Sequence, residues 1–172
     1  MAIILLDTCV ITDLAQPDSD WFEWSASTLE MLDGEKNANI LSILETAGRL
    51  ADKEGMEVYV VGGLVRDLMM GLPLNDIDIM TVGEGIPFAK KLSDELGVKK
   101  IIPFKKFGTA MIPNKSVQIE VATARTESYN DDSRKPSEVI YTNLKGDLLR
   151  RDFTINAMAM DILPDTFGNL TD

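Results

Sequence analysis

Apolar and polar residues alternate along this chain with two different periods. In the stretch ILSILETAGRLADKEG the apolar positions are spaced as on one face of a helix, which predicts a helix that ends at Gly55. From residue 57 onward the runs EVYVV, NDIDIMTV and VQIEVAT have the length and composition of strands. Helical patterns at 64–71 and 86–97 separate these runs. Strands that alternate with helices predict an α/β or α+β fold with helices packed on a sheet.

Shorter patterns complete the expected order of elements. Further strands are expected at 99–104, 108–112 and 117–123. The polar segment 126–138 predicts a mobile loop, and RRDFTINAMAMDIL predicts a closing helix. Near the N-terminus, IILL predicts a short buried strand, WFEWSASTLEMLD an amphipathic helix, and GEKNAN a break.

The run NDIDIM, residues 75–80, places two aspartates one residue apart in a strand. Successive strand side chains point to opposite faces, so Asp76 and Asp78 share one face while Ile77 and Ile79 share the other. Two carboxylates roughly 6–7 Å apart repel each other by about 2–3 kcal/mol at an effective dielectric constant near 20. A bound cation removes that cost, so the pattern predicts a metal site. The apolar second face predicts that this strand is central in the sheet.

The absence of histidine narrows the chemistry more than any other feature of the composition. It excludes Ser-His-Asp and Cys-His catalysis as well as histidine-ligated zinc. Cys9 is the only cysteine, so an intramolecular disulfide is excluded and the ligands left for a metal are oxygens. Oxygen ligands favour Mg²⁺, Mn²⁺ or Ca²⁺.

The net charge of −11 argues against a free-standing binder of long nucleic acid, because such proteins are usually basic. A surface that grips a polymer is therefore expected elsewhere, although local basic groups can still build a nucleotide site. No apolar run approaches the ~18 residues of a membrane span, so no membrane partner is expected. A single cysteine fits a reducing compartment and predicts a cytoplasmic location.

The pair Gly62-Gly63 stands between a predicted strand and a predicted helix. Backbone N–H groups at such a turn can bind an anion, and Arg66, one turn into the helix, can add charge-assisted bonds to a phosphate. A plain tight connection, with Arg66 paired to Asp67, is the alternative. The phosphate interpretation gains weight because the paired aspartates follow soon afterwards, and both features together suit a metal-bound triphosphate.

Two further groups of polar residues are candidates for the same site. Glu120 lies within an otherwise apolar strand, where an acid is costly unless it is paired or metal-bound; a solvent-facing acid on an edge strand is the alternative. Arg150 and Arg151 open the predicted closing helix against its dipole, which favours a nearby anion. Asp152 and Asn156 are spaced i, i+4 and offer partners for sugar hydroxyls, unless they are simply an aspartate favoured by the dipole and a solvated asparagine.

Taken in order, the motifs YVVGGLVRDLMMGLPLNDIDI, FGTAMI, IEVATAR with RKP, and RRDFTINAMAM resemble the bacterial-type tRNA nucleotidyltransferase and poly(A) polymerase family, which includes the CCA-adding enzymes. The resemblance covers residues 57–172. It implies a polymerase-β-like nucleotidyltransferase head with a mixed sheet flanked by helices. It also implies binding of ATP or CTP with two Mg²⁺ ions, Mn²⁺ being possible, and transfer of a nucleotide to an RNA 3′ hydroxyl, that of tRNA in particular, with release of pyrophosphate.

The resemblance assigns roles to individual acids. Asp76 and Asp78 match the metal-binding pair of the family, and Glu120 matches a position often treated as a third catalytic carboxylate. The segment 126–138 matches a flexible loop that family members use when they switch between nucleotides.

The resemblance also implies the contacts to the nucleotide. Gly63 and Arg66 match contacts to its phosphates, and Arg151 with its neighbours matches the motif that holds the sugar and phosphates. The expected nucleotide-binding residues are Gly62, Gly63, Arg66, Arg150, Arg151, Asp152 and Asn156.

Residues 1–50 are not a usual lead-in to such a head, and we treat them as a strand-and-helix extension of uncertain origin before a head domain at 51–172. Their opening strand loosely resembles the start of PIN-domain ribonucleases, with Asp7 as the first carboxylate and Glu45 as the second. The other acids of such a nuclease are not evident downstream. A fused remnant, or a lead-in in which Asp7 caps a helix, is therefore preferred to a metal nuclease.

Members of the family continue through a neck, a body and a tail, and this chain ends at Asp172. Base selection and tRNA gripping are expected in those further parts, in agreement with the net charge of −11. We therefore expect the chain alone to bind metal and nucleotide weakly and to add little or no CCA. The alternative is a nucleotide-binding head that needs a partner chain. The motifs do not distinguish the addition of CCA from that of A, CC or poly(A).

Overall fold

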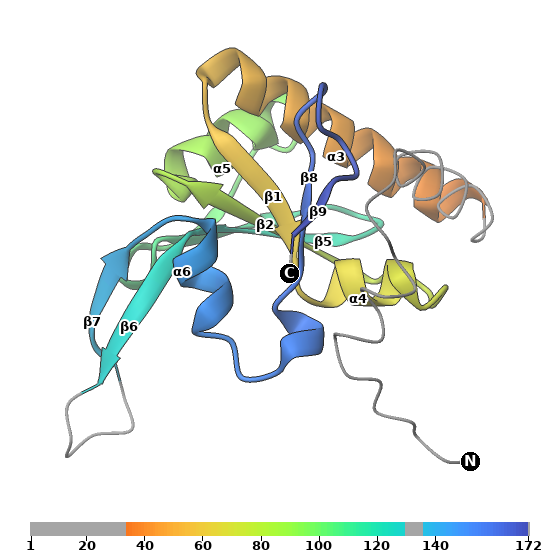
Figure 1. Ribbon diagram of the computed structural model, residues 1–172. Helices are drawn as coiled ribbons and strands as arrows, with labels where there is room; N and C mark the ends of the chain where they lie inside the picture. Colours follow the sequence, from red (N-terminus) through yellow and green to blue (C-terminus); the bar gives the residue numbers. More distant parts are fainter. Residues whose placement is uncertain (1–33, 130–135, 172) are drawn as a thin grey trace.

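The computed structural model describes residues 34–129 and 136–171 (Figure 1). The strand predicted at 3–6 and the helix predicted at 21–33 lie outside the described residues. The helices are α3 (Gly34–Glu54), α4 (Gly63–Met69), α5 (Gly85–Glu95) and α6 (Leu144–Leu149), with the 3-10 turns η1 (Lys105–Phe107) and η2 (Thr154–Asn156). The strands are β1 (Glu57–Val61), β2 (Asp76–Val82), β3 (Ile102–Phe104), β4 (Thr109–Pro113), β5 (Gln118–Thr123), β6 (Arg125–Tyr129), β7 (Pro136–Tyr141), β8 (Ala159–Asp161) and β9 (Leu170–Thr171).

Seven strands form one mixed sheet in the order β3-β4-β5-β2-β1-β8-β9. β2 pairs antiparallel with β1 and parallel with β5. A parallel pair needs a crossover connection, which α5, β3 and β4 provide. β2 is thus the central strand, with Ile77 and Ile79 buried. Both the mixed sheet with flanking helices and the central position of the aspartate strand confirm the predictions.

The helices α3, α4 and α5 enclose the main hydrophobic core against one face of the sheet. Alternate strand residues enter this core, including Val60 of β1 and Ile119 of β5. The α3 residues that the helical pattern identified are buried, namely Ile40, Ile43, Leu44, Ala47 and Leu50. Because burying one such leucine or isoleucine stabilises the fold by about 1.5–3 kcal/mol, this stripe fixes α3 on the sheet.

The helix α3 approaches the end of β8 so closely that no side chain fits at Gly48. A Cβ atom there would lie 1.8 Å from the carbonyl oxygen of Ile162. A glycine in a helix interior costs about 1 kcal/mol relative to alanine. The close backbone contact explains why this helix carries one.

The opposite face of the sheet carries a smaller apolar cluster and a row of charged side chains. Leu148 of α6 packs in this cluster with Val61, Met80 and Ala159. Figure 1 shows α6 on the other side of the sheet from α3 and α5. Since Asp78 is two residues from Met80 on the same strand, it projects from this face.

The helix α3 begins earlier than the sequence pattern predicts. The segment GEKNAN, expected to be a break, forms its first turns. Lys36 Nζ donates to Asn75 Oδ1 at 3.1 Å, and Asn39 Nδ2 donates to Ser116 Oγ at 2.5 Å. These tertiary partners outweigh the weak helix propensity of asparagine. The same helix runs through residue 50, and the domain boundary placed there stays a prediction.

The closing helix predicted over RRDFTINAMAMDIL does not form. Instead η2 is a single 3-10 turn and Ala159–Asp161 is strand β8. Met158 and Met160 lie in the main core while Ala159 lies on the other face, which is the alternation of a strand. Pairing with β1 stabilises this extended form. Phe153, at the start of this segment, is 61% exposed.

The polar segment 126–138, predicted to be a mobile loop, contributes to a second sheet. β6 and β7 pair antiparallel, with Thr126 opposite Ile140. The high polarity of the segment obscured the short β-rich runs RTESY and EVIY at its two ends. Residues 130–135 lie outside the described ranges.

The longest described helix, α3, has 21 residues, and the charged side chains of Glu45 and Arg49 lie on its exposed side. Within residues 34–129 and 136–171 no helix is both long and apolar enough to cross a bilayer.

Candidate active site

Three acidic side chains project from one face of the sheet near its centre. Asp78 of β2 and Glu120 of β5 are direct partners in the parallel register, and Asp76 is paired with Gln118 at the start of both strands. Asp78 and Glu120 are half-buried, whereas Asp76 is exposed. The edge-strand alternative for Glu120 is wrong, because β5 has β2 on one side and β4 on the other.

The pKa of Asp78 lies above its ordinary value. Burial is the largest cause, and the negative charge of Glu120 raises the pKa further. The positive charge of Arg151 lowers it, and Asp76 raises it by the smallest contribution. The surroundings therefore disfavour the ionised form of this carboxyl group, and such shifts are common at functional sites.

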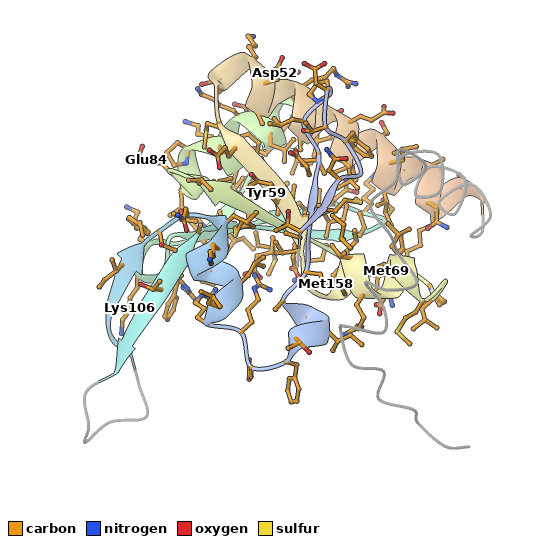
Figure 2. The ribbon with its side chains drawn as sticks, in the orientation of Figure 1. Asp52, Tyr59, Met69, Glu84, Lys106 and Met158 are labelled. Carbon is orange, nitrogen blue, oxygen red and sulfur yellow. The ribbon has the colours of Figure 1, made fainter. Side chains whose placement is uncertain are left out.

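Asp78 and Glu120 line a pocket of about 320 Å³, whereas Asp76 lies outside its lining. The sheet contributes the end of β1, the middle of β2, the start of β4 and part of β5. The rest comes from α6, the residues just after it, and the start of β6. The lining residues are Val61, Asp78, Ile79, Met80, Thr109, Glu120, Ala122, Arg125, Asp147, Arg150 and Arg151. Figure 2 draws the side chains on the ribbon, with Tyr59 marking β1 and Lys106 marking η1. Equal numbers of acids and arginines thus converge on one cavity.

The two consecutive arginines are held by Asp147 of α6. Asp147 Oδ1 accepts from Arg150 Nε at 3.0 Å and Nη2 at 2.9 Å. Asp147 Oδ2 accepts from Arg151 Nε at 3.1 Å and Nη2 at 2.9 Å. The arginines follow the C-terminus of α6 rather than opening a helix, so the helix dipole favours them, and the prediction that they oppose a dipole is wrong.

The glycine turn between β1 and α4 touches the site. Gly62 has φ 69° and ψ −127°, a conformation for which glycine is suited. A Cβ atom at Gly62 would lie 3.2 Å from Arg151 Nη1 and 3.9 Å from Asp78 Oδ2. The N–H of Gly62 donates to the carbonyl oxygen of Met158 at 3.1 Å, so this amide is engaged within the protein. Gly63 is the first residue of α4.

Arg66 is turned toward protein partners rather than toward the pocket lining. Its Nε donates to Asp67 Oδ1 at 2.7 Å, which is the pairing considered as the alternative. Its Nη1 donates to Asn156 Oδ1 at 2.8 Å, and the carbonyl oxygen of Asn156 accepts from Arg151 Nη1 at 3.3 Å. Asn156 therefore links the two arginines. Asp152 is exposed and shares no helical face with Asn156, because no helix forms there.

Two charged residues of the pocket, Asp147 and Arg125, were not predicted from the sequence. For Asp147 a signal was present, since Arg150 and Arg151 follow it at i+3 and i+4 on a short helix. Arg125 gives no local signal. Its Nη1 donates to the carbonyl oxygen of Phe107 at 3.0 Å, and its guanidinium lies 5.7 Å from the centre of the Phe107 ring, a contact made only in the folded chain.

The residues suit a divalent cation that arrives with phosphate ligands. Within the described residues no group of three acidic side chains is placed so that it could hold a metal by itself. Mg²⁺ is usually held by one or two carboxylates, and water and substrate phosphates complete its coordination. Asp78 and Glu120 are adjacent carboxylates of like charge, and the pKa of Asp78 is raised. Both features suit a cation that is held by two carboxylates.

The nuclease hypothesis gains no support from the described part of the chain. Glu45 lies on α3, on the other side of the sheet from Asp78, where its side chain is 51% exposed and 3.8 Å from Arg49 Nη1. Asp7 lies outside the described residues.

Comparison with known proteins agrees with these features. The family model of the poly A polymerase head domain matches residues 58–172. The A-adding tRNA nucleotidyltransferase of Aquifex aeolicus is 42% identical over 117 residues, which are 68% of this chain and 14% of that protein. The CCA-adding enzyme of Bacillus pumilus is 45% identical over 111 residues, which are 64% of this chain and 26% of that enzyme.

Solved structures give the same result. A CCA-adding enzyme in its apo form II has a TM-score of 0.74 at 38% identity, covering 86% of this chain and 34% of that one. A tRNA nucleotidyltransferase complexed with a primer tRNA and an incoming ATP analog has a TM-score of 0.60 at 38% identity, covering 73% and 34%. The chain thus spans between 14% and 34% of the length of these proteins. Because the family model matches well over half of its residues, the chain belongs to the poly(A) polymerase head-domain family.

Proposed function

We propose that this chain is the nucleotide-binding and catalytic head of a tRNA nucleotidyltransferase. ATP or CTP binds in the pocket formed by β2, β5 and the end of α6, and a nucleotide is transferred to the 3′ hydroxyl of a tRNA with release of pyrophosphate. The names of the two relatives, an A-adding tRNA nucleotidyltransferase and a CCA-adding enzyme, support this reaction class. The choice among CCA, A, CC and poly(A) addition stays open.

The observation that carries the proposal is the pairing of Asp78 with Glu120 beside arginines in one pocket. Carboxylates suit hard divalent cations, and guanidinium groups suit phosphates. A nucleoside triphosphate with its metal is a ligand that presents both partners. The volume of about 320 Å³ falls at the lower end of the usual range for small-molecule sites.

We assign Asp76 and Asp78 as metal ligands and Glu120 as the third catalytic carboxylate. When bound, a divalent cation such as Mg²⁺ or Mn²⁺ neutralises phosphate charge and lowers the pKa of the attacking hydroxyl. The raised pKa of Asp78 supports this role, because burial and the charge of Glu120 disfavour its ionised form and a bound cation would favour it. The presence of two ions, which the family resemblance implies, stays a prediction.

The phosphates are assigned to the arginine side of the pocket. Arg150 and Arg151 offer planar donors that suit phosphate oxygens. Gly62 keeps the adjoining turn free of a side chain beside Arg151, and Gly63 follows it at the start of α4.

The remaining predicted contacts are assigned a supporting part. Arg66 fixes Asn156 by its hydrogen bond, and Asn156 in turn meets Arg151. Asp152 is exposed near this motif and stays a predicted sugar contact.

Binding and transfer are best measured separately on the 172-residue chain. Calorimetric titration with ATP or CTP, with and without Mg²⁺, tests the pocket. We expect weak, Mg²⁺-dependent binding that Asp78→Asn abolishes and that Asp94→Asn, on the exposed side of α5, leaves unchanged. The proposal is refuted if neither nucleotide binds in a Mg²⁺-dependent way.

Transfer is tested with labelled ATP or CTP and a tRNA that lacks its 3′ end. We expect little or no extension by the chain alone, because gripping a tRNA needs a basic surface and this chain carries a net charge of −11. Robust CCA addition by the purified chain would contradict this expectation.

A second candidate is a nucleotide-binding head that acts only with a partner chain. The strong net negative charge favours it, because gripping a tRNA needs a basic surface. The two candidates differ in one experiment, the addition of a separate polypeptide that carries the remaining parts of a relative. Extension of tRNA in that mixture supports the partner chain, and extension only when the parts are covalently joined supports the first candidate. The cytoplasmic location stays a prediction.

A further inference from the structure

A buried carboxylate that no expected role accounts for lies at the centre of the arginine side of the pocket. The side chain of Asp147 is 2% exposed, and both of its oxygens are occupied by arginine donors. We propose that Asp147 is a positioning residue, which holds the guanidinium groups of Arg150 and Arg151 in the orientation that meets the phosphates of a bound nucleotide. This inference rests on the proposed function, because it names how that site is assembled.

The contact geometry separates the two arginines. Oδ1 of Asp147 accepts from Nε and Nη2 of Arg150, and Oδ2 accepts from Nε and Nη2 of Arg151. Each guanidinium therefore meets one carboxylate oxygen through two nitrogens on one side, which fixes the plane of the group as well as its position. The backbone N–H of Arg125 also donates to Oδ1, at 3.1 Å, and ties the start of β6 to the same carboxylate.

The exposure of the three groups shows which of them a ligand can reach. The side chains of Arg150 and Arg151 are 25% and 21% exposed, while Asp147 is almost completely covered. All three residues line the pocket, but the arginine side chains are far more accessible than the aspartate, so they are the groups that an entering phosphate can reach.

Arg151 is fixed at a second point. Its Nη1 donates to the carbonyl oxygen of Asn156 and lies beside the Gly62 turn. The same guanidinium lowers the pKa of Asp78, so it lies within electrostatic reach of the acidic row. The position of the Arg151 guanidinium, which Asp147 helps to set, therefore affects both the arginine side of the pocket and the acidic side chains opposite it.

A simple charge effect and a positioning effect predict opposite results for Asp147→Asn. Removal of a negative charge makes the pocket more positive and, by charge alone, strengthens the binding of an anion. Loss of the contacts from Asp147 to both arginines allows the guanidinium groups to reorient, and this weakens the binding of a phosphate chain. We expect the second effect to dominate, with a loss of about tenfold, which is what the loss of roughly one charge-assisted hydrogen bond gives.

The experiment titrates the wild-type chain, Asp147→Asn and a control with ATP, inorganic tripolyphosphate and adenosine in the presence of Mg²⁺. We expect Asp147→Asn to weaken ATP and tripolyphosphate by the same factor and to leave adenosine unchanged. The control is Asp161→Asn, because Asp161 Oδ1 also accepts a backbone N–H, that of Leu163 at 2.9 Å, but lies outside the pocket lining. Unchanged or tighter binding of tripolyphosphate by Asp147→Asn overturns the inference.

A double-mutant cycle distinguishes positioning from general destabilisation. In an Arg151→Ala background, Asp147→Asn should add clearly less to the loss of tripolyphosphate affinity than it does alone, whereas additive losses contradict the positioning role. If Asp147→Asn fails to fold, Arg151→Lys replaces it, since lysine keeps the charge but cannot make the two-nitrogen contact. That variant should also bind tripolyphosphate about tenfold more weakly, and equal binding overturns the inference.

A readout without nucleotide separates the failure of this inference from failure of the proposed function. The Nε–H signals of Arg150 and Arg151 in NMR spectra should exchange slowly with water in the wild type and in Asp161→Asn, and rapidly in Asp147→Asn. A wild type that shows these signals but binds neither ATP nor CTP refutes the proposed function and the phosphate role with it. A wild type that binds nucleotide while the signals and affinity are insensitive to Asp147 refutes only the positioning role.

Discussion

Asp78 and Glu120 stand directly opposite each other on the parallel strands β2 and β5, and each is half-buried. Like charges in this relationship destabilise a sheet, because neighbouring side chains on one face are only about 5 Å apart. The fold nevertheless places them at the centre of its largest sheet, beside arginines that reach the same pocket. The cost is understandable if ligand binding, rather than folding, is what the acids serve.

Asp78→Asn is expected to stabilise the free protein while it abolishes Mg²⁺-dependent nucleotide binding. The substitution relieves the repulsion from Glu120 and the burial of a charge, so the free energy of unfolding at pH 7 should rise by about 0.2–1 kcal/mol. Urea unfolding followed by circular dichroism measures the change. The control is Asp94→Asn, which removes the same charge from an exposed position of α5.

The stabilisation by Asp78→Asn should depend on pH with a definite sign. The pKa of Asp78 is higher in the folded protein than its ordinary value of 3.8, so the folded state holds this proton more tightly than the unfolded chain does. The contribution of Asp78 to stability therefore falls as the pH rises through its raised pKa. The gap between Asp78→Asn and the wild type should be smallest below the ordinary value and grow toward neutral pH. A gap that shrinks with rising pH would contradict this account.

Gly62→Ala and Gly71→Ala form a matched pair. Both glycines have positive φ, 69° and 63°, so each alanine should cost about 1–3 kcal/mol in backbone strain. A Cβ at Gly62 meets Arg151 Nη1 at 3.2 Å, whereas a Cβ at Gly71 meets nothing within 4 Å. The midpoint temperature of thermal unfolding should therefore be lower in both variants, but only Gly62→Ala should weaken the binding of ATP. Equal binding by the two variants would place the Gly62 turn outside the site.

Gly48→Ala should destabilise the protein, although alanine is the better helix former. The new methyl group would overlap the carbonyl oxygen of Ile162, and overpacking of this kind costs about 1–3 kcal/mol. Helix propensity alone predicts a gain of about 1 kcal/mol. Urea unfolding decides between the two signs, with Ser42→Ala on the exposed side of the same helix as the control.

Arg66→Lys should weaken nucleotide binding although Arg66 itself does not line the pocket. Lysine keeps the charge but cannot bond Asp67 and Asn156 together, so Asn156 loses one of its two arginine contacts. We expect a loss of roughly threefold to tenfold in ATP affinity, as for one hydrogen bond of about 1 kcal/mol. Calorimetric titration measures it, with Arg49→Lys on the exposed face of α3 as the control.

The faces on which the acidic side chains lie could be predicted from the sequence, because they depend only on strand alternation. The period of two in NDIDIM places Asp76 and Asp78 on one face, and the same rule applied to VQIEVAT places Glu120 there. The parallel register that brings Asp78 opposite Glu120 is a tertiary result, which no local pattern determines.

Arg150 and Arg151 line the pocket, but the element predicted to carry them is wrong. Helical spacing in RRDFTINAMAMDIL competes with strand alternation at Met158, Ala159 and Met160, and pairing with β1 decides the outcome. Both arginines therefore follow the C-terminus of α6, where Asp147 binds them. Local periodicity cannot decide between a helix and a strand where the sequence fits both, because the free energy that favours the strand comes from pairing with a strand distant in the sequence.

The parallel pairing of β2 with β5 has a consequence for how the pocket comes into being. Since the chain must pass through α5, β3 and β4 before Glu120 reaches Asp78, the acidic row has high contact order and no short fragment can carry it. The pairing of Asp78 with Glu120 therefore forms only once β5 has docked on β2. Any nick or insertion that prevents β5 from docking would separate Glu120 from Asp78, even where the N-terminal half of the domain keeps its helices.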